Sequence, residues 1–184
     1  MMRTVTVGFV ALTDAAPLIV AKELGFAEEE GLDLHLSREN SWSAIRDKLS
    51  FGLIDAAHML SPMAIAMSLG LGTAKSPTHA VMVLSQNGNS FLAGQELHKE
   101  LTALGAKPFD AASLGAALIA RAQTRPVKIA VPFMTSMHVA LLQFLVQSCG
   151  GDPRQCLDFV VSPPHMVDRV LLALKTRPDV LEWN

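Results

Sequence analysis

The sequence is short of cysteine and of charge. Its two cysteines, Cys149 and Cys156, are too few for a disulfide scaffold. Only 17% of the 184 residues are charged, and 15 Lys and Arg stand against 17 Asp and Glu, so no excess of positive charge favours a nucleic-acid partner. Apolar residues make up 50% of the chain, which excludes extended disorder. We therefore expect a folded globular chain.

No uncharged stretch has the uninterrupted apolar sequence that is typical of a membrane span. Residues 56–74, 76–95 and 129–151 are each long enough to cross a bilayer, but His, Pro, Gln or Gly residues interrupt them. We expect strand–turn–helix passages there and no membrane insertion. Met1 and Met2 lead almost directly into a strand-like run, with no secretory signal. This start favours a cytoplasmic protein, or a periplasmic one if the chain is a mature form.

Strand-like and helix-like segments alternate along the chain. The strand-like runs are residues 5–10, 32–36, 53–57, 80–84, 127–131 and 159–161. Because the helices between them would act as crossovers, the alternation predicts an α/β fold with parallel sheets. The helices expected between strands include residues 111–122, with Asp110 as the cap, and residues 166–175. The series restarts after Arg125-Pro126. We therefore predict a first α/β lobe at 1–105, a helical linker and hinge region at 106–126, and a partial second α/β lobe at 127–184.

Polar residues stand where the expected strands end and helices begin. They are Thr13-Asp14, Asn40-Ser41-Trp42, His58 with Ser61, Gln86 to Asn89, Thr135-Ser136 with His138, and Ser162 with His165. Asp14 and Ser61 are expected to cap the helices that follow them. Open α/β sheets bind ligands at the carboxyl ends of their strands, and helix starts present free N–H groups. The recurrence predicts a site for a small anion or polar ligand, although each residue alone also fits an ordinary helix cap.

Trp42 and His138 are the main candidates for ligand contact. Trp42 follows a polar turn, where its indole N–H can donate to a ligand or its ring can anchor a helix on the sheet. His138 lies at the mouth of a helix, and its ring can donate to an oxyanion whether neutral or charged. The sequence has no His-Glu-x-x-His, Cys-x-x-Cys, Gly-x-Ser-x-Gly or phosphate-loop motif. We expect no catalytic residue, no metal and no cofactor.

Seven segments carry a family resemblance. They are residues 7–18 (VGFVALTDAAPL), 21–26, 37–49, 55–63 (DAAHMLSPM), 87–89, 134–138 and 160–167. These segments resemble the nitrate- and bicarbonate-binding solute receptors of bacterial ABC importers and the related cytoplasmic sensors of nitrate and nitrite. The resemblance implies a two-lobed clamshell of the periplasmic-binding-protein type (type II). Such a clamshell closes on a small oxyanion in the cleft between its lobes, without chemistry.

The resemblance also implies which residues contact the anion and which proteins the chain works with. In the family, a Trp and a turn amide of the first lobe and a His of the second lobe contact the anion. The matching positions are Trp42, Gln86 or Asn89, and His138; Thr13 and Ser41, from the turns after the first two strands, complete the ligand-binding set that we expect. The implied ligand is nitrate, nitrite or bicarbonate, and the implied partner is an ABC permease or a cytoplasmic regulatory protein.

The chain departs from the family in length. Family members are about twice as long, and the lysine that they use for anion charge would lie beyond Asn184, so we expect the second lobe to be incomplete. Two alternatives stay open. One is an enzyme on the same scaffold, similar to the pyrimidine-precursor synthases of thiamine biosynthesis. The other is a fragment that folds but binds nothing.

Overall fold

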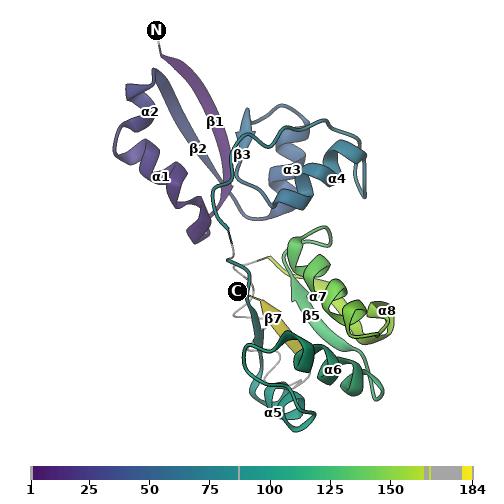
Figure 1. Cartoon of the computed structure of the whole chain (residues 1–184). Coiled ribbons are helices and arrows are strands. Elements are labelled where there is room, and N and C mark those ends of the chain that lie inside the picture. Colours follow the sequence, from purple (N-terminus) through teal and green to yellow (C-terminus); the bar gives the residue numbers. More distant parts are fainter. Residues whose placement is uncertain (1, 87, 164–165, 167–179, 184) are drawn as a thin grey trace. The chain divides into compact units, whose positions relative to one another are not determined.

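The computed structural model describes residues 2–86, 88–163, 166 and 180–183 (Figure 1). The chain forms two compact units, Met1–Gly88 and Asn89–Asn184, which are called the first and the second unit below. Each unit is built from a β-sheet and the helices that pack on it. Among the described residues, every helix is too short or too polar to span a bilayer.

The first unit holds a three-stranded parallel sheet. Its strands β1 (Arg3–Val10), β2 (Leu32–Glu39) and β3 (Ala56–Ala57) lie in the order β2-β1-β3. β1 pairs in parallel with both neighbours, so that Val10 stands opposite Glu39 and Gly8 opposite Ala57. The predicted parallel pairing is confirmed. The carboxyl ends of the three strands therefore share one edge, which is where polar residues follow each strand.

Helices lie beside both edge strands of this sheet, β2 and β3 (Figure 1). The 3-10 helix η1 (Thr13–Ala15), α1 (Ala16–Glu23) and α2 (Phe26–Glu29) follow β1, and α1 and α2 pack beside β2 (Figure 1). Helix α3 (Trp42–Ser50) contacts all three strands and buries Trp42 and Ile45. Helix α4 (Ser61–Leu69) follows β3. Leu60, in extended conformation, is its N-cap and Pro62 lies in its first turn, so the prediction that Ser61 is the cap is wrong by one residue.

The second unit has a four-stranded mixed sheet. The order is β4-β7-β5-β6, with β4 at Phe91–Ala93, β5 at Val127–Val131, β6 at Leu157–Val161 and β7 at Val180–Trp183. β5 runs parallel to β6 and β7, whereas β4 pairs antiparallel with β7. Strand β5 is the centre of the unit, because Val127, Ile129 and Val131 are fully buried. An inner strand of this kind needs apolar residues on both faces.

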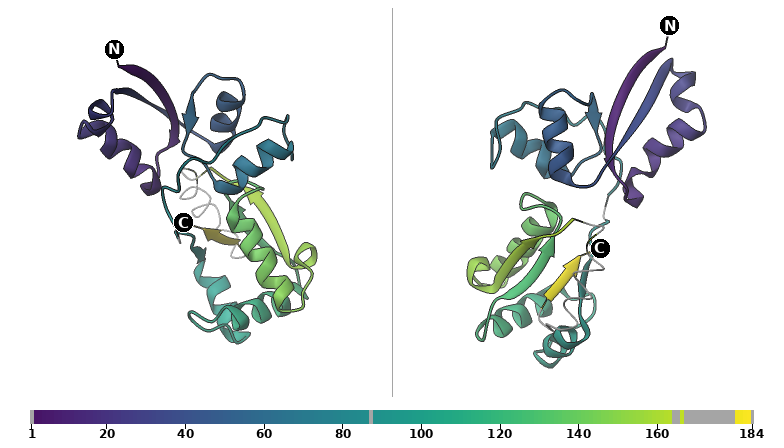
Figure 2. Two further views of the ribbon diagram at one scale, coloured as in Figure 1. Left: turned by 45° about the horizontal axis from the view of Figure 1, so that its top comes forward. Right: turned by 180° about the vertical axis from the view of Figure 1, so that it is seen from behind.

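In the described part of the second unit, four helices pack with the sheet, and two of them pack tightly together. They are α5 (Gln95–Ala103), α6 (Ala111–Ala122), α7 (Met137–Ser148) and α8 (Pro153–Cys156). Helices α6 and α7 lie side by side (Figure 2). Gly115 permits this approach, because a Cβ at that position would press on Cys149 and Leu145 of the facing segment. Leu97 of α5 and Leu118 of α6 are buried in the core around β5. The division between Gly88 and Asn89 places α5 and α6 in the second unit. The lobe and hinge limits expected at 105 and 126 stay a prediction.

Residues 80–84 do not form the predicted strand. They are described, yet they belong to no ladder, and the Val81, Met82 and Val83 side chains are exposed. A β-branched run becomes a strand only where another strand accepts its backbone hydrogen bonds, and within the described part of the chain none does so. The helix expected at 166–175 and the polar residue His165 lie outside the described residues, apart from Met166.

Candidate functional site

Polar side chains follow all three strands of the first sheet at its carboxyl edge. Asp14 lies in η1 after β1, Trp42 opens α3 after β2, and His58 follows β3. The His58 backbone N–H donates to the Gly8 carbonyl at 2.8 Å, which holds His58 against the sheet. Because the strands are parallel, the fold brings together three residues that are far apart in the sequence. This edge is where open α/β sheets bind ligands.

A hydrogen bond joins Asp14 and His58 at this edge. His58 Nε2 lies 3.1 Å from Asp14 Oδ2, and the His58 side chain is 4% exposed. The hydrogen bond from His58 lowers the pKa of Asp14, and this effect outweighs the rise that burial alone would cause. A carboxylate only accepts, so Nε2 carries the proton of this bond. The prediction that Asp14 caps a helix is wrong: Leu12 and Ala15 occupy the cap positions, and His58 takes the carboxylate.

Trp42 lies against His58 and is almost completely buried. The two ring centroids are 5.2 Å apart in an edge-to-face arrangement, and Trp42 is 2% exposed. Trp42 Nε1, His58 Nδ1 and Asp14 Oδ1 are buried atoms that have no hydrogen-bond partner among the described residues. An indole N–H can only donate. A buried donor without an acceptor costs about 1–3 kcal/mol, so the site favours a bound acceptor oxygen.

Ser41 and Thr13, two further predicted ligands, lie at the same edge. Ser41 is the N-cap of α3, and its Oγ accepts from the Ala44 backbone N–H at 3.1 Å. This bond fixes the start of α3 and with it the position of Trp42. Thr13 is an exposed residue of η1. That either side chain contacts a ligand stays a prediction.

Gln86 and Asn89 flank the division between the two units. Gln86 belongs to the first unit and Asn89 to the second, and both are exposed. Asn87, between them, lies outside the described residues. The structure therefore does not test whether either amide contacts an anion.

The second unit gathers hydroxyl groups at the carboxyl edge of its parallel strands. Thr135 and Ser136 follow β5, and Ser162 follows β6, with its backbone N–H bonded to the Val131 carbonyl at 2.9 Å. Thr135 Oγ1, Ser136 Oγ and Ser162 Oγ are buried without a hydrogen-bond partner in the described part of the chain. Ser136 is the N-cap of α7 but makes no side-chain cap bond. These hydroxyls and the start of a twelve-residue helix can donate to a polar ligand.

His138 lies in the first turn of α7, two residues after Ser136. It is 5% exposed, and its ring stands edge-to-face to Phe91 with centroids 6.4 Å apart. Burial lowers the pKa of His138 to about 4, so the ring is neutral at pH 7. A neutral imidazole donates through one nitrogen only. That His138 contacts the same anion as Trp42 stays a prediction.

The buried neutral ring predicts acid sensitivity of the second unit. Because the pKa of His138 is lower in the folded chain than the ordinary value near 6.5, the unfolded chain binds more protons between these two values. Stability should therefore fall as the pH drops through this window, by about 2 kcal/mol between pH 7 and pH 5. Urea unfolding of the wild type and of His138→Gln at both pH values measures the effect. His98→Gln, at an exposed position of α5, is the matched control. An equal loss in wild type and His138→Gln would contradict the prediction.

The contact between Asp14 and His58 was not foreseen from the sequence. The available signal was that both residues directly follow expected strands, which places them at one sheet edge.

Among the described residues, no three His, Cys, Asp or Glu side chains gather closely enough to hold a metal ion.

The chain is similar to known proteins over most of its length. The model of the NMT1-like family matches residues 2–173. The chain is 34% identical over 170 residues to the nitrate/nitrite binding protein NrtA of Synechocystis sp., which covers 89% of this chain and 36% of that protein. It is 30% identical over 113 residues to the bicarbonate-binding protein CmpA of Synechococcus elongatus, covering 58% of this chain and 25% of that protein.

Solved structures show the same fold. The periplasmic nitrate-binding protein NrtA from Synechocystis superposes with a TM-score of 0.79 at 28% identity, over 99% of this chain and 46% of that one. The aliphatic sulphonate binding protein SsuA of Escherichia coli superposes with a TM-score of 0.59 at 12% identity, over 100% of this chain and 54% of that one, which shows the fold alone. The predicted α/β fold of the periplasmic-binding-protein type is confirmed. The chain spans about a quarter to a half of the length of these relatives.

Proposed function

Because the chain belongs to the NMT1-like family, as its match to residues 2–173 shows, we propose that it binds a small oxyanion such as nitrate, nitrite or bicarbonate. The observation that carries the proposal is the indole of Trp42. This N–H is buried at the carboxyl edge of a parallel sheet and has no acceptor among the described residues. The relatives named as nitrate- and bicarbonate-binding proteins support the choice of ligand class.

The chemistry of both units suits such a ligand. Small oxyanions present several acceptor oxygens, and hydrogen bonds to a charged acceptor are about twice as strong as neutral ones. The first unit offers the Trp42 indole. The second unit offers the buried hydroxyls of Thr135, Ser136 and Ser162 and the N-terminus of α7. These groups bind and orient a ligand but provide no nucleophile paired with a base, so the proposed function is binding without chemistry.

We place this binding in import by an ABC transporter. Two relatives of this chain from Synechocystis sp. carry the names of a nitrate-binding protein and of a nitrate import ATP-binding protein. A permease of such a system is therefore the proposed partner. The cytoplasmic location expected from the sequence stays a prediction, and the solved NrtA relative is described as periplasmic.

Isothermal titration of this chain with sodium nitrate, sodium nitrite and sodium bicarbonate tests the proposal. We expect at least one anion to bind, with sodium chloride at equal ionic strength giving no saturable heat. Trp42→Phe keeps an aromatic ring and removes the N–H, so it should weaken binding roughly tenfold to a hundredfold. Circular dichroism of the unliganded variant checks that α3 still forms. If none of the three anions binds the wild type, the proposed function is wrong.

A further inference from the structure

We propose that His58, held by Asp14, is a second hydrogen-bond donor to the anion that Trp42 binds. This inference rests on the proposed function and names a further ligand-binding residue of the same site. It assigns the first unit two donors, the indole Nε1 and the imidazole Nδ1. Neither the expected ligand set nor any helix cap includes the His58 ring.

The position of the His58 ring carries the inference. One nitrogen, Nε2, is occupied by Asp14 at 3.1 Å, and the other, Nδ1, is buried with no partner among the described residues. The ring centroid lies 5.2 Å from that of Trp42, whose Nε1 is in the same condition. Two polar nitrogens without a partner among the described residues therefore lie on neighbouring rings of one site. One bound oxyanion would satisfy both, whereas the described part of the chain satisfies neither.

The contact with Asp14 decides the protonation state in which His58 would bind. Since Nε2–H donates to the carboxylate, Nδ1 can also donate only when the ring is an imidazolium. The Asp14 carboxylate stays ionised, because the bond from His58 lowers its pKa. The imidazolium would then lie between two negative groups, Asp14 and the anion. This arrangement stabilises the buried cation and lets the anion complete its hydrogen bonds.

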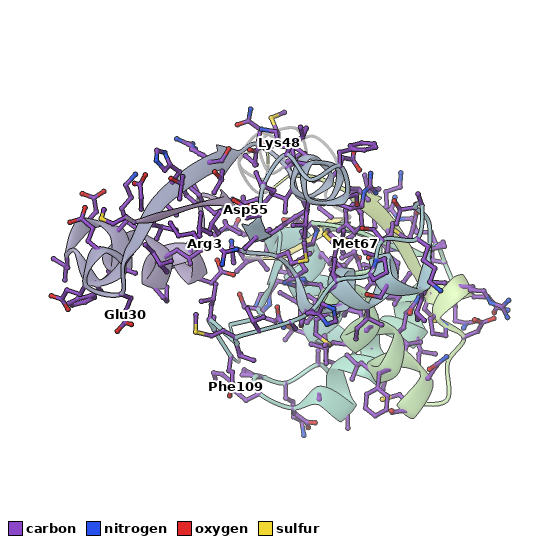
Figure 3. All side chains as sticks on the ribbon, turned by 90° about the horizontal axis from the view of Figure 1, so that it is seen from above. Arg3, Glu30, Lys48, Asp55, Met67 and Phe109 are labelled. Atoms are coloured by element: carbon purple, nitrogen blue, oxygen red, sulfur yellow. The ribbon has the colours of Figure 1, made fainter. Side chains whose placement is uncertain are left out.

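Asp14 is the described carboxylate that touches His58, and several other charged groups on the surrounding elements bond to groups other than His58. Those pairs are Glu39 of β2 with Lys48 of α3 at 2.6 Å, Arg46 with Asp47 of α3 at 2.7 Å, and Asp55 with the Thr6 backbone N–H at 2.8 Å. Lys48 and Asp55 are labelled in Figure 3, which shows the described side chains. Bonds from Lys48 and Ser37 keep the pKa of Glu39 low despite its burial. Helix α4 and strand β3 carry no charged residue.

His58→Gln separates a ligand contact from a purely structural role. The Gln amide N–H takes the place of Nε2–H and keeps a donor for Asp14, but nothing replaces the Nδ1 donor. We expect roughly tenfold to a hundredfold weaker binding of nitrate, nitrite or bicarbonate in isothermal titration. The matched control is His35→Gln, because His35 also bonds a carboxylate, Asp33, at 3.0 Å in the same unit but is exposed. This control should bind as the wild type does.

A spectroscopic measurement on the unmodified chain tests the protonation directly. In nitrogen NMR of chain labelled at its histidines, the ring of His58 should show imidazolium signals when the anion is bound, and His58→Gln assigns these signals by their loss. Titration in two buffers with different heats of ionisation should show less proton uptake on anion binding in His58→Gln than in wild type. If His58 serves only to hold Asp14, anion binding produces no imidazolium signals from His58, and His58→Gln takes up as many protons on anion binding as the wild type does.

The outcomes separate this inference from the proposed function. If the wild type binds an anion and His58→Gln binds it equally well, or the bound-state ring of His58 is neutral, the inference is overturned and the proposed function stands. If the wild type binds none of the three anions, both are overturned. Should His58→Gln fail to fold, Gln variants of the other five histidines assign the His58 ring by elimination, and the spectrum of the wild type with anion decides the protonation of Nδ1.

Discussion

Leu142→Ala should lower the free energy of unfolding of the second unit by about 2–5 kcal/mol. Leu142 of α7 is 1% exposed and belongs to the core that includes Leu118, Ile129 and Val146. Removing its branched end takes apolar surface out of a close-packed region and leaves a cavity that the neighbouring β5 cannot fill without moving. Urea unfolding followed by circular dichroism and by amide hydrogen exchange within the second unit measures the loss.

The adjacent residue supplies a matched control for this prediction. Leu141 has the same side chain on the same helix, but it is 41% exposed. Leu141→Ala makes the same change in helix propensity and creates no internal cavity, so its effect should stay within about 0.5 kcal/mol. Equal losses for the two variants would mean that α7 is not packed on the sheet as described. Because His138 lies on this helix, a large loss only at Leu142 also shows that packing holds the His138 segment in place.

Elements whose signals lie within their own residues could be predicted from the sequence. The helix expected at 111–122 forms with those bounds, and Asp110 caps it by accepting from the Ser113 backbone N–H at 3.2 Å. The strand expected at 127–131 also has those bounds and is buried. A cap residue and an apolar, β-branched run need no knowledge of distant partners, because their physical effect is local.

Features that depend on distant partners could not be predicted. Residues 80–84 have the composition of a strand, but the described chain offers them no neighbour. Asp14 stands in a good position for a cap, yet the carboxylate bonds His58, which only the pairing of β1 with β3 brings near. A side chain that can serve either its own backbone or a remote partner is decided by the tertiary fold.

The candidate site shows the same division. The sequence predicted that strand ends would bring polar residues together, and in the first unit they do so at Asp14, Trp42 and His58. It left Trp42 open between a ligand donor and a packing anchor. The structure gives the indole both properties, since the ring is buried against His58 and its Nε1 has no acceptor among the described residues. The burial of that single atom, which composition cannot reveal, supports the ligand interpretation.

Glu100→Gln should destabilise the second unit by about 2–3 kcal/mol, more than the loss of an exposed ion pair. Arg121 of α6 is 6% exposed, and its Nε donates to Glu100 Oε2 of α5 at 3.2 Å. A second bond runs from its guanidinium to the Arg125 carbonyl at 2.7 Å. Removing the carboxylate leaves the buried cation without this offsetting charge. The cost stays below that of a fully buried pair because Glu100 is about half exposed.

Two further variants identify the cause of the loss. Glu96→Gln removes the carboxylate of an exposed pair with Lys99 on the same helix, and it should change the free energy of unfolding by no more than about 0.5 kcal/mol. Arg121→Met removes the buried charge itself while keeping much of the apolar stem, so Glu100→Gln should cost little more in that background. Urea unfolding of the wild type, Glu100→Gln, Arg121→Met and the double variant gives the coupling energy between Glu100 and Arg121. If Glu100→Gln costs as much with Met at position 121 as with Arg, the loss does not come from an uncompensated cation.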